Sequence, residues 1–406
     1  MKPHILVISQ YFYPENFRIN DICREWVKRG YDITVVTGIP NYPQGVFYEG
    51  YSWFKRRREE LEGIHIIRIP LISRRNNSVR LALNYISFVI SGLVWKLFTN
   101  ITADRVFIFE VSPMTQALVG VWFAKKRKIP CYIYVQDLWP ENVETIAGIH
   151  NKIIIHAIDK MTDYIYDNCE KIFATSLSFV KRLEERKSVY KQGASKVVYW
   201  PQYAEAFYRP VKRRKLKELP DNNRFRIVFT GNIGYAQGLD ILPKVAKILK
   251  SKMKSCEFVI IGNGRYQNEL KKEIEANRVE DMFIKVKEKK PDEIPQFLAA
   301  CDIAYLSFAD NELFKMTIPA KLQSYMACGM PILAVAEGET AQIVEKAKCG
   351  VCCRFGDIQG AADAVIRFME GKEDIESMKH NALDYCKKHF NKEELMKLVE
   401  REMKIE

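Results

Sequence analysis

A lysine in the first turn of a predicted helix is the clearest chemical signal in this sequence. The segment 316–331 predicts a helix that begins near Pro319, ends at Gly329 and leads into the apolar strand 331–335, because proline suits a first helical turn and glycine follows a last one. Lys321 then faces the positive end of the helix dipole, which costs roughly 0.3–1 kcal/mol unless an anion binds there. Free backbone N–H groups and a lysine together form a phosphate site. The alternative is a solvated surface lysine.

Two glycine-containing loops follow predicted strands in the same half of the chain. Segments 229–234 and 261–264 each come directly after an apolar run. Glycine lets a backbone approach a phosphate closely and turn its N–H groups towards it. Each loop alone is also compatible with a plain tight turn, whereas the two loops together with the Lys321 helix indicate a ligand site.

Five blocks of this sequence resemble the family 4 retaining glycosyltransferases, and within them the bacterial enzymes of capsule, O-antigen and exopolysaccharide assembly. In chain order the blocks are Ser9–Asn16, Gln136–Glu141, Phe229–Gly238, Ile260–Gly264 and Ile318–Gly329. Each block is weak alone, but five in this order cover nearly the whole chain. The resemblance implies an α/β architecture of the GT-B type, in which two Rossmann-like, doubly wound parallel-sheet domains face a cleft and the C-terminal helix crosses back to the first domain.

The resemblance also implies that the second domain binds a nucleotide sugar. The candidate donor-binding residues are Gly231, Asn232, Gly234, Gln237, Gly262, Gly264, Arg265, Pro319, Ala320, Lys321 and Ser324.

The sequence departs from the family at four of the positions that hold a donor. Many members carry Arg and Lys after the first strand of the second domain, and this chain has Asn232 and Gln237 there. The Glu-x7-Glu pattern, whose second glutamate binds the ribose, is replaced by Met316 and Ser324. Neutralisation of the diphosphate is therefore expected to depend on Lys321, with helix N-termini and a further cation assisting.

The catalytic candidates follow the short apolar strand 131–135. Related enzymes often have a histidine near this point, and none of the six histidines of this chain lies there. The resemblance therefore leaves Asp137 and Glu141 as the ionisable groups that could contact the acceptor hydroxyl or the donor sugar. The departing diphosphate is the alternative general base, and a helix cap is the alternative role of Asp137.

An unusually aromatic loop, 10–18, follows the first strand. Aromatic faces stack on the CH surfaces of sugars, while charged and amide side chains supply directional hydrogen bonds. The loop corresponds to the acceptor-side loop of the family, although the usual pair of glycines is absent, and a rigid turn is the alternative. The acceptor-binding candidates are Tyr11, Tyr13, Pro14, Glu15, Asn16, Arg18 and Trp139.

The elements that must position these residues alternate between strand and helix along both halves of the chain. This alternation predicts parallel sheets with helices on both faces, and such sheets bind ligands at the carboxyl ends of their strands. A polar, proline-containing stretch, 209–223, separates the halves. We therefore expect an acceptor-binding domain over residues 1–200, a donor-binding domain over 201–380 and a returning helix over 381–406.

The charge of the chain is concentrated in its first half. Residues 1–200 carry 28 Lys and Arg against 19 Asp and Glu, which gives +9 of the total net charge of +13. Basic residues and the 15-residue uncharged run 81–95 occur in this half. The run is shorter than the ~20 residues needed to cross a bilayer, so it is either a buried core helix or a helix in the membrane interface. The adjoining arginines favour the second interpretation and a peripheral position at the cytoplasmic membrane face; no motif supports nucleic acid.

No Asp-x-Asp pair occurs in the chain, so the sequence gives no sign of a divalent metal held against a diphosphate, and we expect neither a metal nor another cofactor. The predicted function is transfer of a sugar, with retention, from a nucleotide diphosphate, UDP by resemblance, to a polyprenyl-diphosphate-linked saccharide. A nucleotide-sugar epimerase of the same fold and a non-catalytic glycan-binding or partner-binding relative are the alternatives. The epimerase would require paired carboxylates or histidines.

Overall fold

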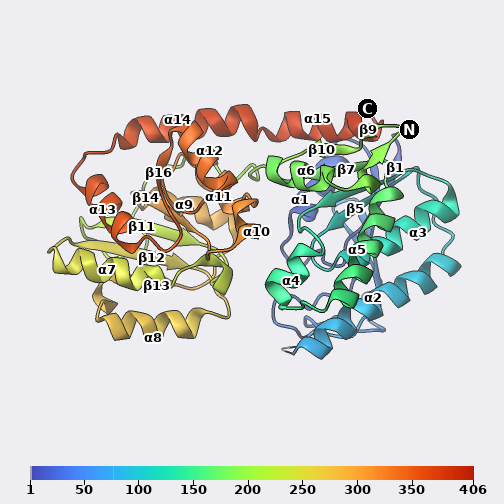
Figure 1. Ribbon diagram of the computed structural model, residues 1–406, viewed down its shortest axis with the longest axis horizontal. Helices are drawn as coiled ribbons and strands as arrows, with labels where there is room; N and C mark the ends of the chain where they lie inside the picture. Colours follow the sequence, from blue (N-terminus) through green and yellow to red (C-terminus); the bar gives the residue numbers. More distant parts are fainter. Residues whose placement is uncertain (1, 76) are drawn as a thin grey trace. The chain divides into compact units, whose positions relative to one another are not determined.

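The computed structural model describes residues 2–75 and 77–406, which fall into two compact units (Figure 1). Unit 1 comprises Met1–Trp200 and Met396–Glu406, and unit 2 comprises Pro201–Leu395. Each unit contains one large sheet.

The sheet of unit 1 has eight strands, of which only the edge strand β3 is antiparallel to its neighbour. Across the sheet the strands are β10 (Val197–Tyr199), β7 (Lys171–Ala174), β6 (Cys131–Val135), β5 (Arg105–Glu110), β1 (His4–Ile8), β2 (Asp32–Gly38), β4 (Ile64–Ile69) and β3 (Arg58–Leu61). The central strands are continuous apolar runs and are almost completely buried, as expected for a parallel sheet covered on both faces. The helices of this unit are α1 (Arg18–Lys28), α2 (Ser78–Phe98), α3 (Ala117–Arg127), α4 (Glu141–Ala147), α5 (Lys152–Asp167) and α6 (Leu177–Glu184).

The sheet of unit 2 has six strands, and all of its pairings are parallel. Across the sheet the strands are β13 (Phe283–Val286), β12 (Cys256–Ile261), β11 (Phe225–Thr230), β14 (Ile303–Ser307), β15 (Ile332–Val335) and β16 (Gly350–Cys353). Along β11 the side chains alternate between two cores, with Val228 in one and Ile227 and Phe229 in the other. The helices are α7 (Ile241–Ser251), α8 (Gln267–Asn277), α9 (Ile294–Ala299), α10 (Glu312–Lys315), α11 (Ala320–Ala327), α12 (Glu339–Ala347), α13 (Ile358–Met369) and α14 (Ile375–His389).

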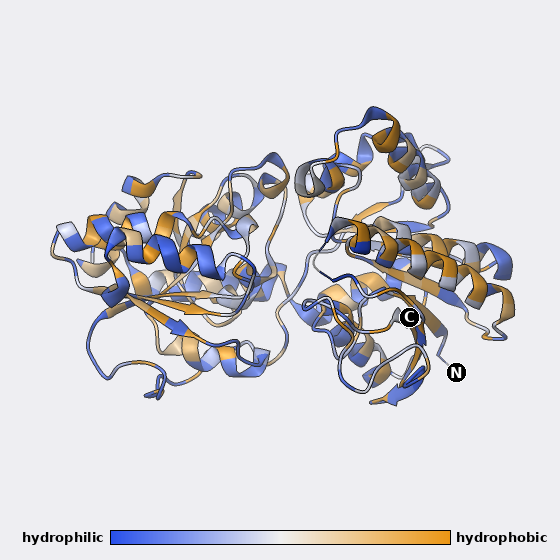
Figure 2. Ribbon diagram, turned by 90° about the horizontal axis from the view of Figure 1, so that it is seen from below, coloured by the Kyte–Doolittle hydropathy of each residue, from blue (hydrophilic) through white to orange (hydrophobic). Residues whose placement is uncertain are grey.

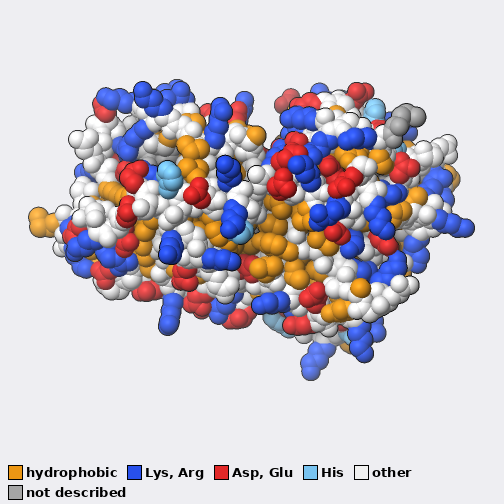
Figure 3. Space-filling model, turned by 90° about the horizontal axis from the view of Figure 1, so that it is seen from above, with side chains coloured by type: hydrophobic (Ala, Val, Ile, Leu, Met, Phe, Trp, Pro, Cys, Tyr) orange, Lys and Arg blue, Asp and Glu red, His pale blue; other side chains and the backbone are white. Residues whose placement is uncertain are grey.

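The end of the chain belongs to unit 1, although unit 2 precedes it. The last helix, α15 (Lys392–Met403), follows α14, and residues from Met396 onwards pack on the first unit. The Tyr31 hydroxyl donates to the Ile405 carbonyl at 2.8 Å, and the Tyr132 hydroxyl donates to the Met403 carbonyl at 3.1 Å. The view onto α14 and α15 shows basic and acidic side chains intermixed (Figure 3).

The apolar run 81–95 lies in α2, which is not a core helix. Among the described residues of α2, only Asn84, Phe88 and Gly92 are buried. The helix is long and apolar enough to cross a membrane by length and composition. Figure 2 shows its hydrophobic colouring along most of its length. The interpretation as a buried core helix is therefore wrong.

Candidate functional site

Lys321 occupies the first turn of α11 in unit 2, at the carboxyl end of the sheet. The helix begins after Pro319, and no side chain caps this end within the described part of the chain. The position of α11 is set by Tyr325, whose hydroxyl accepts a hydrogen bond from the Thr230 backbone N–H at 2.9 Å. Because Thr230 is the last residue of β11, this contact holds the uncapped helix end near the end of the central strand.

Among the described residues, the Lys321 ammonium group has no carboxylate partner to account for its position. Its Nζ donates to Gln237 Oε1 and lies 4.1 Å from the centre of the Phe229 ring. Burial alone lowers the pKa of Lys321 to about 7. Gln237, which replaces a family cation, thus orients the lysine instead of adding charge. An anion beside Lys321 would restore the positive charge of the lysine, and a diphosphate is the anion that the sequence predicts at this position.

Ser324 serves its own helix. It is buried, and its hydroxyl donates to the Ala320 carbonyl one turn earlier at 3.2 Å. This arrangement gives no support to the predicted contact between Ser324 and a ribose.

The two glycine loops contact each other. A side chain at Gly262 would place its Cβ 1.9 Å from the Gly231 carbonyl oxygen, and one at Gly264 would lie 2.1 Å from the Ile233 carbonyl oxygen. The Ile233 N–H donates to the Asn263 carbonyl at 2.8 Å. Gly231 and Gly262 also have φ values of 124° and 144°, which side chains rarely tolerate. Close backbone packing is therefore one reason for these glycines, and it brings both loops to the same edge of the sheet.

The remaining donor candidates differ in exposure. Asn232 and Arg265 are exposed and Gly234 is half-buried, so these loop positions are open to a ligand. Lys315, a further cation near α11, is paired with Glu312 at 2.7 Å and with Glu337 at 3.6 Å. Arg265 is therefore a better candidate than Lys315 to assist Lys321.

Glu339, which none of the sequence motifs indicated, is the first residue of α12 and is 6% exposed. Its neighbour Thr340 donates from Oγ1 to the Thr317 carbonyl at 2.8 Å, so the start of α12 lies beside the segment that leads into α11. A buried carboxylate therefore lies near the uncapped end of α11, although the Glu-x7-Glu positions carry none. The signal in the sequence is a glutamate directly after a glycine, just past a buried strand.

In unit 1, Glu15 holds two loops together. It is 2% exposed, and its Oε1 accepts hydrogen bonds from the Asn41 and Tyr42 backbone N–H groups, each at 2.7 Å. Burial raises the pKa of Glu15 to about 7, while these backbone hydrogen bonds oppose the shift. The contacts make Glu15 a residue that shapes the loop, and they leave no exposed carboxylate for an acceptor.

The aromatic loop forms a partly buried cluster. The Tyr11 ring stacks on Phe17 with 5.2 Å between centroids, and both rings pack on Tyr42. The Arg74 guanidinium lies 5.1 Å from the centre of the Tyr42 ring. Tyr11 is buried, whereas Tyr13 and Asn16 are exposed and Pro14 and Arg18 are half-buried. The surface of this loop open to a sugar is therefore formed mainly by residues other than Tyr11.

Asp137 lies after β6, beside a second carboxylate that the sequence motifs do not indicate. Asp137 Oδ2 accepts the Ser112 N–H at 2.7 Å, and the Asp137 N–H donates to Glu110 Oε2 at 3.4 Å. Glu110 ends β5 and is fully buried. Burial, and then the charge of Asp137, raise the pKa of Glu110 well above its usual range, and burial also raises the pKa of Asp137. The pair can therefore hold a proton at the carboxyl edge of this sheet.

Glu141 and Trp139 are engaged in structural contacts. Arg182 Nε donates to Glu141 Oε1 at 2.7 Å, which links α4 to α6. Trp139 is 8% exposed, and its indole N–H donates to Ser112 Oγ at 3.2 Å. Of the two predicted catalytic residues, Asp137 is the one whose surroundings favour proton chemistry.

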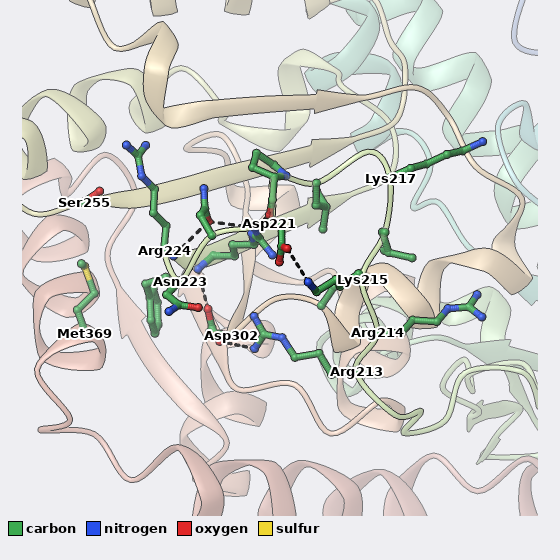
Figure 4. A pocket seen from close by; sticks show the side chains of 17 residues that line it. Arg213, Arg214, Lys215, Lys217, Asp221, Asn223, Arg224, Ser255, Asp302 and Met369 are labelled. Carbon is green, nitrogen blue, oxygen red and sulfur yellow. Dashed lines mark hydrogen bonds and ion pairs between the residues drawn. The ribbon is translucent and has the colours of Figure 1, made fainter.

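The described residues contain no group of three or more His, Cys, Asp or Glu side chains that could hold a metal ion. A separate hollow of about 920 Å³ lies at the opposite, amino-terminal end of β11 (Figure 4). Both of its carboxylates are paired, with Arg213 3.0 Å from Asp302 and Lys215 2.5 Å from Asp221. Its position separates it from the candidate donor site.

Residues 211–384 match the family model for glycosyl transferases group 1. This segment is therefore similar to group 1 glycosyltransferases. It contains Lys321, Gln237, Glu339 and both glycine loops.

Two curated relatives are similar to this chain. The putative colanic acid biosynthesis glycosyl transferase WcaI of Escherichia coli K12 is 25% identical, with 97% of this chain and 98% of WcaI covered. The amylovoran biosynthesis glycosyltransferase AmsK of Erwinia amylovora is 28% identical over 37% of each chain. The chain is thus similar to glycosyltransferases named for exopolysaccharide biosynthesis.

Solved structures show the same fold at low sequence identity. Sucrose-phosphate synthase from Thermosynechococcus elongatus is 13% identical, with a TM-score of 0.75 over 98% of each chain. Anabaena Alr3699/HepE, solved in complex with UDP-glucose, is 13% identical, with a TM-score of 0.69 over 99% of each chain. With the two parallel sheets described above, these neighbours confirm the predicted GT-B fold.

Proposed function

We propose that this protein is a retaining glycosyltransferase that uses a UDP-sugar of the hexosyl or N-acetylhexosaminyl class and needs no metal. The observation that carries the proposal is Lys321, a cation without a carboxylate partner among the described residues, at the uncapped end of α11 in the segment that matches group 1 glycosyltransferases. A diphosphate supplies the negative charge that this end lacks. The UDP-glucose complex of Alr3699/HepE, which has the same fold, supports UDP as the carrier.

The proposed acceptor is a polyprenyl-diphosphate-linked saccharide of capsule, O-antigen or exopolysaccharide assembly. Similarity to WcaI over nearly the full length supports a role in cell-surface polysaccharide biosynthesis. The acceptor would bind at the exposed residues of the 10–18 loop in unit 1, where Tyr13 and Asn16 are available. A lipid-linked acceptor would place the reaction at the cytoplasmic membrane face.

In the proposed reaction, the bond between the anomeric carbon and the β-phosphate oxygen breaks while the acceptor oxygen bonds to that carbon. Lys321 stabilises the charge that develops on the departing diphosphate. The acceptor proton passes to the diphosphate or to Asp137, whose pKa is raised by burial next to Glu110. Glu339 is the proposed carboxylate for ribose hydroxyls, in place of the absent family glutamate.

The Glu110–Asp137 pair also bears on the alternative of an epimerase, which requires paired carboxylates. An epimerase would convert the sugar of the donor without any acceptor. A non-catalytic relative would bind glycan or a partner and would convert nothing. Both alternatives are therefore distinguishable in one assay.

The test incubates the purified protein, in EDTA, with a panel of nucleotide sugars and a bacterial polyprenyl-linked lipid extract. Acceptor-dependent release of UDP from one donor, with the sugar label entering the lipid, is the expected result. Conversion of the donor sugar without lipid would establish the epimerase. Absence of both reactions, with no nucleotide binding by calorimetry, would show a binding relative.

A further inference from the structure

The inward face of α2 mixes polar and apolar contacts, with Phe88 fully buried and Trp95 stacked on Phe123 at 5.4 Å between ring centroids. The same face also carries polar side chains: Asn84 Nδ2 donates to the Ile72 carbonyl at 2.6 Å, and Ser87 Oγ accepts the Ile72 N–H at 2.9 Å. Gly92 lies against α3, where an added Cβ would meet Val119 Cγ2 at 2.4 Å. A surface helix of a water-soluble domain normally turns its apolar stripe inwards.

The outward face of α2 is a continuous apolar stripe. Ile86 and Ile90 are 55% and 57% exposed, and Phe98 at the end of the helix is 81% exposed. The exposed apolar residues of α2 are Val79, Leu83, Ile86, Ile90, Leu93, Val94, Leu97 and Phe98. Their spacing of three and four residues places most of them on one side of the helix. An apolar surface of this extent marks an interaction site.

The charge around this stripe has one sign. No aspartate or glutamate occurs between Glu62 and Asp104, a stretch that includes the whole of α2. Arg75 and Arg80 lie at the start of the helix. Near the end of the helix, a second lysine lies beside Lys96: Lys126 Nζ donates to the Lys96 carbonyl at 3.0 Å. Cations at both ends of an apolar face complement an anionic surface with an apolar interior.

We propose that α2 docks this protein on an anionic lipid bilayer and lies in the plane of the interface, with the stripe Val79–Phe98 in the acyl region. An in-plane position follows because the inward face of α2 packs on α3 and on η1 (Met114–Gln116), so lipid cannot surround the helix. The single-sign charge argues for lipid over a second copy of the chain, which would bring the same cations together at a two-fold contact.

The docking helix also belongs to the wall of the candidate acceptor region. Gln10 Nε2 donates to Asn84 Oδ1 at 2.7 Å, and Asn84 Nδ2 lies 3.4 Å from Asn41 Oδ1. The charges of Arg74 and Asp137 both act on Tyr85, the next residue of α2. This part of the inference depends on the proposed function: with α2 at the interface, the 10–18 loop and Asp137 would lie where a lipid-linked acceptor presents its diphosphate and sugar.

The test is cosedimentation of the full chain with vesicles of phosphatidylcholine alone or with added phosphatidylglycerol, without any nucleotide sugar. The protein should bind the anionic vesicles, and high salt should weaken binding. The variant I86E/I90E should lower the partition coefficient by roughly tenfold or more, because each carboxylate must enter the acyl boundary. The charge variant R80Q/K96Q should lower it several-fold, roughly as two cations near the surface contribute.

The control is M253E, which places one carboxylate on a 92% exposed apolar residue of unit 2 and should leave vesicle binding unchanged. Circular dichroism and thermal melts confirm that the variants fold. Equal binding of I86E/I90E and the unmodified protein would overturn the proposal. So would a dimer in lipid-free solution that I86E/I90E converts to monomer without loss of vesicle binding. Because no sugar donor is used, failure of docking and failure of the transferase proposal are separable.

Discussion

The carboxyl-terminal edges of the two parallel sheets differ in the chemistry they offer. In unit 2 the edge consists of backbone: two glycine loops that contact each other and the uncapped end of α11, where Lys321 supplies the cation. In unit 1 the edge consists of side chains: the buried Glu110–Asp137 pair and the aromatic cluster around Tyr11. The first suits a diphosphate, whose oxygens accept hydrogen bonds, and the second suits a sugar hydroxyl that must lose a proton. Similar sheets thus support different tasks through the residues at their ends.

The proposed difference in chemistry between the two sheet edges is tested most strongly at Asp137. If unit 1 carries the proton chemistry, Asp137→Asn should lower the rate of transfer by roughly 10²–10⁴-fold, while the affinity for the donor stays unchanged. The measurement is kcat for label transfer, with donor Kd from calorimetry. Glu141→Gln, which affects an ion pair with Arg182, should lower kcat far less. Equal losses in both variants would contradict the assignment.

A backbone site in unit 2 should be intolerant of added atoms. Gly262→Ala should destabilise this unit by about 3 kcal/mol, since the new methyl would meet the Gly231 carbonyl at 1.9 Å and φ is unfavourable. Urea unfolding measures the change. Gly371→Ala provides the control: it also has positive φ, at 67°, but nothing lies within 4 Å of its added Cβ. A control as unstable as the variant would show that conformational strain, not contact between the loops, is the cause.

The charge of Lys321 should account for most of the electrostatic attraction to the donor. Lys321→Ala should weaken UDP-sugar binding by roughly 10- to 100-fold, the effect of losing a charge-assisted contact. Lys315→Ala removes a nearby lysine that is already paired with Glu312 and Glu337, and it should change the donor Kd little. If calorimetry shows the same Kd for Lys321→Ala and the unmodified protein, the diphosphate is bound elsewhere.

The lowered pKa of Lys321 predicts the smallest of these effects, a pH dependence of donor binding. In the empty site the pKa is about 7, and a bound diphosphate must raise it. The affinity for the donor should therefore be highest below pH 7. Above pH 7 it should fall by up to about tenfold per pH unit, until the pH exceeds the pKa of Lys321 in the donor complex.

The measurement is calorimetry with a UDP-sugar, whose diphosphate has no titration near pH 7. Lys321→Arg keeps its charge across this range and should show a flat profile. A flat profile for the unmodified protein would mean that the lysine is charged before the donor arrives.

Sequence patterns predicted the elements of both units well, because parallel sheets need continuous apolar strands and helices need caps and glycine stops. The Lys321 helix was expected to begin near Pro319 and end at Gly329, and α11 extends from Ala320 to Ala327. Predictions about single side chains were less reliable. Glu15 and Trp139 were expected to contact an acceptor, yet their polar atoms bond within the protein. Residue type alone does not reveal whether a polar group is already satisfied by its own fold.

The sequence by itself determined the α/β class, the GT-B resemblance and the lysine at a helix start, since these depend on local spacing and order along the chain. Tertiary structure decided which residues meet. Glu110 and Asp137 are distant in sequence but end neighbouring strands, and Gln237 reaches Lys321 only because α11 packs at the end of β11. The tertiary structure also decided which face of α2 is exposed, because an apolar helix can be buried or exposed with the same sequence. Its inward polar contacts, which leave the apolar stripe outside, come from parts of the chain that spacing alone does not bring together.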